Sequence, residues 1–155
     1  MAAPRLTEIA DAALARLAAI TVAGGFNFTT GQAARYSLMP EEATTYPAAF
    51  LRSVYFEERR IVLATDGPNA REALAALKIR LFVQDNDSPW SALEAWAADC
   101  VKALEAAPIG LGLFYVIHIV ATSLEVGSGD LELQKPNAAG TLTVGVIYRM
   151  ARGAI

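Results

Sequence analysis

The segment LKIRLFVQDNDSPWSALEAWAADCVKAL, residues 77–104, constrains the fold more strongly than any other part of the chain. Apolar residues first occupy every second position, as in a half-buried strand: Leu77, Ile79, Leu81 and Val83. They then recur at the spacing of one helix face: Leu93, Trp96, Ala97, Cys100, Val101 and Leu104. We therefore expect a strand over residues 73–84 and then an amphipathic helix from about Pro89 to Ala107, with a polar face that carries Glu94, Asp99, Lys102 and Glu105.

The junction between this strand and this helix contains two alternating acids, Asp85 and Asp87, so a calcium loop is one interpretation. Such a loop needs a glycine at its sixth position and a glutamate at its twelfth. Both positions hold tryptophan here. A strand-to-helix corner is the better interpretation, in which Asp87 or Ser88 caps the helix and Pro89 takes the first helical position.

The rest of the chain predicts one more helix and several strands. The helix covers Leu6–Val22, with Thr7 as its N-cap and Gly24-Gly25 as its stop. Strands are expected at 26–30, 48–56, 113–126 and 140–150. In the second of these, one face should carry Phe50, Arg52, Val54 and Phe56. The 113–126 run is apolar on both faces, which indicates a central strand. Residues 37–47, 57–70 and 127–138 are expected to be long loops, with a possible hairpin extension at residues 61–63 and a turn at 66–69.

This order of elements predicts the fold class. Helix, strands, helix and two further strands indicate an α+β domain, a mostly antiparallel β-sheet with two amphipathic helices packed on one face. A chain of 155 residues is long enough to bury most of its apolar surface as a single domain, residues 1–155.

Composition narrows the class of function. Hydrophobic residues make up 54% of the chain and charged residues 19%, which favours burial of some surface against further copies. A net charge of −3 argues against a dedicated nucleic-acid binder. The single cysteine fits a reducing, cytoplasmic compartment, and we expect neither a secretory signal nor a transmembrane helix.

No residue pattern points to catalysis. The only histidine, His118, lies within a strand pattern, and the chain has no GxSxG elbow for it to serve. Cys100 belongs to the apolar stripe of the second helix, where a free cysteine is usually a buried hydrophobe. Gly24-Gly25 lacks the spacing and lysine of a phosphate-binding loop. We therefore expect a protein that is not an enzyme and that has no cofactor and no metal site.

The order of these elements resembles the phage tail terminator proteins, the siphophage minor tail family. The resemblance rests on four segments: LAAITVAGGFNFTTGQAARY (17–36), TYPAAFLRS (45–53), the segment 77–104 quoted above, and GTLTVGVIYR (140–149). It spans nearly the whole chain, but it lies in pattern and order and carries no unique motif.

The resemblance implies a structural virion protein at the neck-proximal end of the tail, assembled in the bacterial host cytoplasm. Such a protein forms a homo-hexameric ring on the tail tube, stops tube polymerisation and offers the docking surface for the neck and head-completion proteins. DNA passes through the lumen without specific binding, and no membrane is involved. We expect the interface among these residues: Tyr46, Glu57, Glu58, Arg59, Arg60, Asp85, Asp87, Trp90 and Lys135.

Two alternatives remain open. A neck or head–tail connector protein would also form a ring but would bind the portal side. A small enzyme or ligand-binding domain would require His118 and Asp87 to meet in one concave site.

Overall fold

The computed structural model describes residues 4–35, 43–61, 70–126 and 137–151. These residues form, in chain order, α1 (Arg5–Ala18), the 3-10 turn η1 (Val22–Gly24), β1 (Gln32–Arg35), β2 (Ala48–Ile61), β3 (Ala70–Gln84), α2 (Pro89–Glu105), the 3-10 turn η3 (Gly110–Gly112), β4 (Val116–Val126) and β5 (Asn137–Ala151). Predicted loop residues 37–42, 62–69 and 127–136 lie outside the described ranges.

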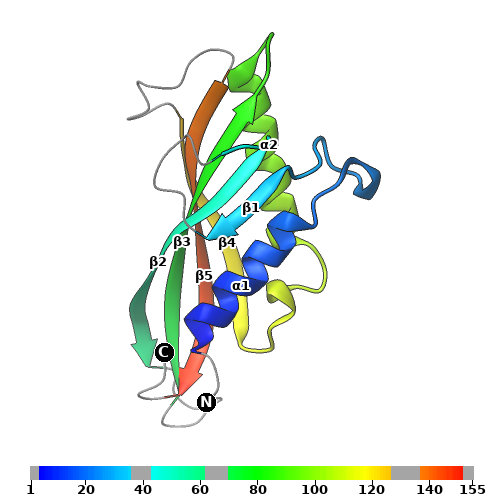
Figure 1. Ribbon diagram of the computed structural model, residues 1–155. Coiled ribbons are helices and arrows are strands. Elements are labelled where there is room, and N and C mark those ends of the chain that lie inside the picture. Colours follow the sequence, from blue (N-terminus) through cyan, green and yellow to red (C-terminus); the bar gives the residue numbers. More distant parts are fainter. Residues whose placement is uncertain (1–3, 36–42, 62–69, 127–136, 152–155) are drawn as a thin grey trace.

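The strands form one sheet in the order β1-β2-β3-β5-β4. Every neighbouring pair is antiparallel except β1 and β2, which are parallel. Both helices lie on the same side of this sheet (Figure 1). The predicted α+β class, with a mostly antiparallel sheet and two helices on one face, is confirmed.

The core lies between the helices and the central strands. The predicted strand face is completely buried, as is most of the predicted helix stripe: Leu77, Ile79, Leu81 and Val83 in β3, and Leu93, Trp96, Cys100 and Leu104 in α2. Burial of such side chains contributes about 1.5–3 kcal/mol each. The Trp96 ring extends past β3, and its indole N–H donates to the Ala48 carbonyl at 3.0 Å. Helix α2 is thereby attached to β2 as well as to β3.

Helix α1 begins one residue before the predicted start and ends four residues before the predicted end. Pro4 is its N-cap, so the expected Thr7 cap is wrong. The glycine pair does not end this helix either, because Gly25 has a positive φ of 91° and closes η1 instead. Arg16 donates from its guanidinium to the Ala106 and Pro108 carbonyls. It therefore satisfies carbonyls just beyond the C-terminal end of α2, which the helix itself leaves unpaired.

The strand expected at 26–30 is wrong, because β1 begins only at Gln32. The alternating burial was correctly inferred, since Phe26 and Phe28 both pack against the core. Their backbone is held by a side chain and not by another strand. The Asp99 carboxylate accepts hydrogen bonds from the backbone N–H groups of Asn27 (3.2 Å) and Phe28 (2.9 Å), and from the Asn27 side-chain amide (3.0 Å). Asp99 is buried, so its predicted place on the polar face of the helix is also wrong.

A β-bulge explains why β2 does not keep one set of residues on each face. After Leu51 the pairing with β3 advances by two residues in β2 and by one in β3, which makes Arg52 the extra residue. Phe50 lies in a small cluster on the sheet face away from the helices, whereas Val54 packs against the helix-side core. The prediction that these two residues share a face is therefore wrong.

Strands extend into two of the segments that were predicted to be loops. β2 continues to Ile61 and β3 begins at Ala70, so residues 57–61 and 70 of the expected loop over 57–70 belong to strands. β5 begins at Asn137, inside the expected 127–138 loop. Strand β4, expected to be central, is instead at one edge of the sheet.

We expect Asp99→Ala to lower the free energy of unfolding by about 2 kcal/mol, because it leaves two partly buried backbone N–H groups without their acceptor. Urea denaturation followed by circular dichroism measures the change. Glu94→Ala, an exposed carboxylate on the same helix, is the matched control and should cost less than about 0.5 kcal/mol. Equal stability of the two variants would contradict a structural role for Asp99.

Candidate functional site

The acidic corner between β3 and α2 is built around Asp85. Its carboxylate accepts hydrogen bonds from the backbone N–H groups of Asp87 (2.9 Å) and Ser88 (2.8 Å). These bonds, that of Ser88 first, lower the pKa of the Asp85 carboxyl below its ordinary value. Ser88 is the N-cap residue but makes no side-chain cap, and Pro89 takes the first helical position as predicted. The expected cap by Asp87 or Ser88 is wrong, and Asp85 instead organises the turn that precedes the helix.

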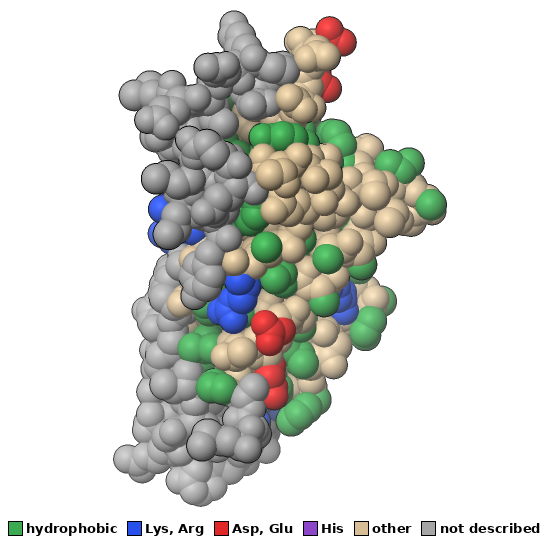
Figure 2. All heavy atoms as spheres, in the orientation of Figure 1, with side chains coloured by type: hydrophobic (Ala, Val, Ile, Leu, Met, Phe, Trp, Pro, Cys, Tyr) green, Lys and Arg blue, Asp and Glu red, His purple; other side chains and the backbone are tan. Residues whose placement is uncertain are grey.

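Asp85, Asp87 and Trp90 are neighbours at one end of the sheet. Asp87 is exposed, and the Trp90 side chain is 48% exposed at the start of α2. Figure 2 shows acidic side chains at this end of the molecule, where β3 meets α2. A large exposed aromatic such as Trp90 is enriched at protein contact surfaces, whereas acids are depleted there and usually lie at the rim.

The predicted mixed-charge run, residues 57–60, does not join this group. Glu57, Glu58, Arg59 and Arg60 lie in β2, and Glu58 pairs with Ala73. Because β3 ends only at Gln84, the mixed-charge run lies about 35 Å from the acidic corner at the usual strand rise. The structure therefore places the predicted residues at opposite ends of the sheet.

Tyr46 has a packing role, and Lys135 lies outside the described residues. The Tyr46 side chain packs against the small cluster on the sheet face away from the helices, which contains Phe50 and Phe82. The Tyr46 carbonyl also lies so close to Gly31 that a Cβ there would be 2.7 Å from it. Such an approach leaves no room for a side chain at residue 31.

The exposed edge of β4 is a feature that the sequence did not reveal. Ile117 and Val120 are 41% and 39% exposed, and the preceding loop adds Ile109 and Phe114 at 82% and 91%. An edge strand also presents unpaired backbone N–H and C=O groups. This combination of apolar side chains and open backbone is suited to pairing with another strand.

His118 and Asp87 do not share a site. His118 is opposite Ile147 of β5, whereas Gln84, three residues before Asp87, is opposite Asn137. Ten residues of strand separate the two levels, or about 30 Å. A single concave site containing both residues is therefore excluded.

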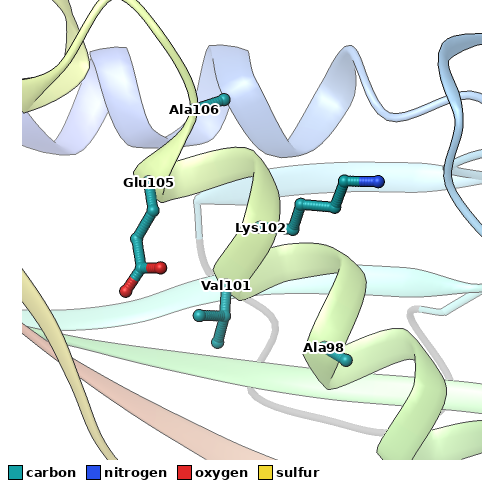
Figure 3. Close-up of a pocket in the computed structure, with 5 residues that line it drawn as sticks. All are labelled: Ala98, Val101, Lys102, Glu105 and Ala106. Atoms are coloured by element: carbon teal, nitrogen blue, oxygen red, sulfur yellow. The ribbon is translucent and has the colours of Figure 1, made fainter.

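A shallow hollow lies along α2 (Figure 3). It is lined by Ala98, Val101, Lys102, Glu105 and Ala106. The Lys102 ammonium donates to the Gly25 carbonyl at 2.7 Å and lies 4.8 Å from the Phe26 ring centroid. The lysine thus secures the η1 turn, and the remaining lining offers little polar chemistry for a ligand.

A tyrosine cluster joins the start of α1 to the end of β5. The Tyr115 hydroxyl donates to Glu8, and the Arg5 guanidinium lies 4.5 Å from the Tyr115 ring centroid. Burial first, and then the hydrogen bond to Glu8, raise the pKa of the Tyr115 hydroxyl. The Tyr148 hydroxyl beneath it is buried, and the described residues provide no hydrogen-bond partner for it. We interpret this cluster as an anchor for α1.

Other chemistry is limited in the described parts of the chain. They contain no group of three or more His, Cys, Asp or Glu side chains arranged to hold a metal ion. Neither described helix is long and apolar enough to cross a membrane. Cys100 is buried, and this burial, followed by the charge of Asp99, raises the pKa of its thiol. A thiol of this kind is a poor nucleophile.

Comparison with known proteins assigns no family: no protein-family model matches the chain, and no curated protein sequence matches it significantly. A function for the chain therefore rests on its own geometry and on the resemblance described above.

We expect Asp85→Asn to lower stability at pH 7, with a difference that disappears in acid. The pKa of Asp85 is lower in the folded chain than in the unfolded one, so its contribution is present above the unfolded pKa and is lost as the pH falls through the folded value. Thermal unfolding at pH 7 and below about pH 3 measures this change. Asp87→Asn removes the same charge two residues away and should have a smaller effect. A pH-independent difference for Asp85→Asn would contradict the assignment.

Proposed function

We propose that this chain is a structural virion protein, a ring-forming subunit that caps the head-proximal end of a phage tail tube. The ring stops tube polymerisation and presents the surface on which the neck and head-completion proteins dock. The mechanism is steric and associative, without catalysis. The observation that carries the proposal is that, among the residues that the structure describes, the sheet has two open edges, one of them with exposed apolar side chains.

Open edges support self-assembly into a ring. β4 forms one edge of the sheet. At the other edge, β1 pairs only with Ala48–Leu51 of β2, so no described strand pairs with the outer side of β2 from Arg52 to Ile61. Two different edges on one subunit favour head-to-tail contacts, and such contacts close into rings when the rotation between copies allows it.

The two ends of the sheet support a cap with unlike faces. One end carries Asp85, Asp87 and Trp90, and the other carries the far part of the β2–β3 hairpin. In a ring whose axis runs along the strands, these ends become its two axial faces. A terminator needs such a difference, because one face must fit the tube end while the other must not continue the tube.

The first test is the solution mass of the purified protein, followed by its addition to polymerising tail tube protein of the same phage. We expect a ring of about six subunits, the number that the resemblance implies, and tubes whose length stops increasing once it is added. Light scattering and negative-stain electron microscopy measure the two results.

The same experiment distinguishes a tail terminator from a neck or connector protein. A ring that ignores tubes but binds head or portal particles would move the assignment to a neck or connector protein. A protein that stays monomeric even in the presence of tubes, and does not shorten them, would overturn the structural proposal.

We expect Trp90→Ala to leave the ring intact and to weaken capping of tubes or docking of neck proteins by at least tenfold. The reason is that an exposed aromatic at the centre of a contact contributes about 2 kcal/mol or more to binding. Val22→Ala is the matched control, because Val22 is 57% exposed in η1, away from the acidic corner. Equal capping by both variants would remove Trp90 from the interface.

A further inference from the structure

The exposed part of β4 and the part of β2 that β1 does not cover lie at the same level along the strand direction. Val120 in β4 is opposite Gly145 in β5. Gly145 is opposite Ala76 in β3, and Ala76 is opposite Tyr55 in β2. Tyr55 belongs to the part of β2 that β1 does not cover. The exposed apolar stretch of β4 and the open stretch of β2 are therefore level across the sheet.

The rest of β4 follows the same correspondence. At its far end, Val126 is level with Ala49, where β1 already occupies the edge of β2. At its near end, Val116 is level with Glu58. Only the first half of β4 thus has an open counterpart on β2, and that half carries the exposed Ile117 and Val120.

The strand directions of β4 and β2, and the sheet faces on which their side chains lie, are also compatible with pairing. Three successive antiparallel pairings connect β2 to β4, so β4 runs opposite to β2. A second copy in the same orientation would therefore present its β2 antiparallel to β4. At equal height, Ala121 of one copy meets Val54 of the next. Val54 packs on the helix side of the sheet, and Ala121 pairs with Val144 of the same core.

We propose that β4 of one copy pairs with the Val54–Glu58 stretch of β2 in a second copy, which gives one continuous sheet around a ring. This inference rests on the proposed ring subunit and names its contact. The occupant is a second copy of this chain because both edges belong to it and match in height, direction and face. A two-fold β4–β4 pairing would leave the open stretch of β2 uncovered in both copies.

The backbone groups that would make this contact can be assigned. The Arg149 N–H donates to the Tyr115 carbonyl, so alternate residues of β5, Gly145 among them, direct their backbone groups towards β4. Val120 is opposite Gly145, so the backbone N–H and C=O of Val120 are directed towards β5. Its neighbour Ala121 faces away from β5, with its N–H and C=O directed to the open side.

The decisive experiment is a disulfide cross-link with the double variant Tyr55→Cys/Val120→Cys. In the proposed register these residues form a pair without mutual hydrogen bonds, whose short Cα separation suits a disulfide. Oxidation of the free protein at high concentration, and of the protein on tube ends, should give a ladder of covalent multimers that ends at the ring size. The native Cys100 is buried and should not contribute.

Single-cysteine variants are the controls. Neither Val120→Cys nor Tyr55→Cys alone should cross-link, and a covalent dimer from Val120→Cys would overturn the proposal in favour of β4–β4 pairing. Absence of a ladder from the double variant in both conditions would also overturn it. Ala121→Pro removes an outward N–H and should give monomers, whereas Ala121→Thr, which keeps that N–H, should still assemble.

The two proposals can fail separately. Cross-linked rings that do not stop tube growth would support the strand pairing and remove the terminator function. A protein that caps tubes without a Tyr55–Val120 cross-link would support the function and overturn the pairing.

Discussion

The packing of α2 against β3 is the contact on which the other elements of this molecule depend. The two are joined by a short corner, and each buries its apolar face directly on the other. Other parts of the chain then attach to α2 through individual polar side chains as well as through the apolar core. Trp96 donates to β2, Asp99 holds the backbone of residues 27 and 28, and Arg16 of α1 donates to carbonyls just beyond the end of α2. The helix is therefore both the cover of the sheet and the common support of these segments.

The sequence predicted best those elements whose burial is periodic. β3 and α2 were located closely because alternation and helical spacing report directly which face is buried. Prediction failed where one residue outside the period decides the structure. The Asp99 carboxylate replaces a strand partner for residues 26–30, and the bulge at Arg52 reverses the faces of β2. The predicted interface residues Asp85, Asp87 and Trp90 lie at one end of the sheet and the run Glu57–Arg60 lies towards the other, because local pattern carries no information about which end of a sheet a distant strand reaches.

Strand β4 shows that the order of strands in the sheet also could not be predicted from the sequence. Its sequence is apolar at most positions and resembles a central strand, but composition cannot specify which strands are its neighbours. The structure gives β4 one partner, β5, and leaves its other side open among the described residues. Open, apolar edges are normally avoided in proteins that function as monomers. An edge of this kind is the surface that the proposed ring would cover, in keeping with the high share of apolar residues.

The position of β5 has a consequence for how the chain folds. β5 follows the other described elements in chain order, yet it is inserted between β3 and β4 and pairs with both along most of its length. The β2–β3 hairpin and α2 can form early from local contacts, but the sheet cannot close until β5 has left the ribosome. Contacts between such distant segments slow folding. Newly made chains would therefore pass through a state with exposed strand edges, in which chaperones and neighbouring chains compete for the place of β5.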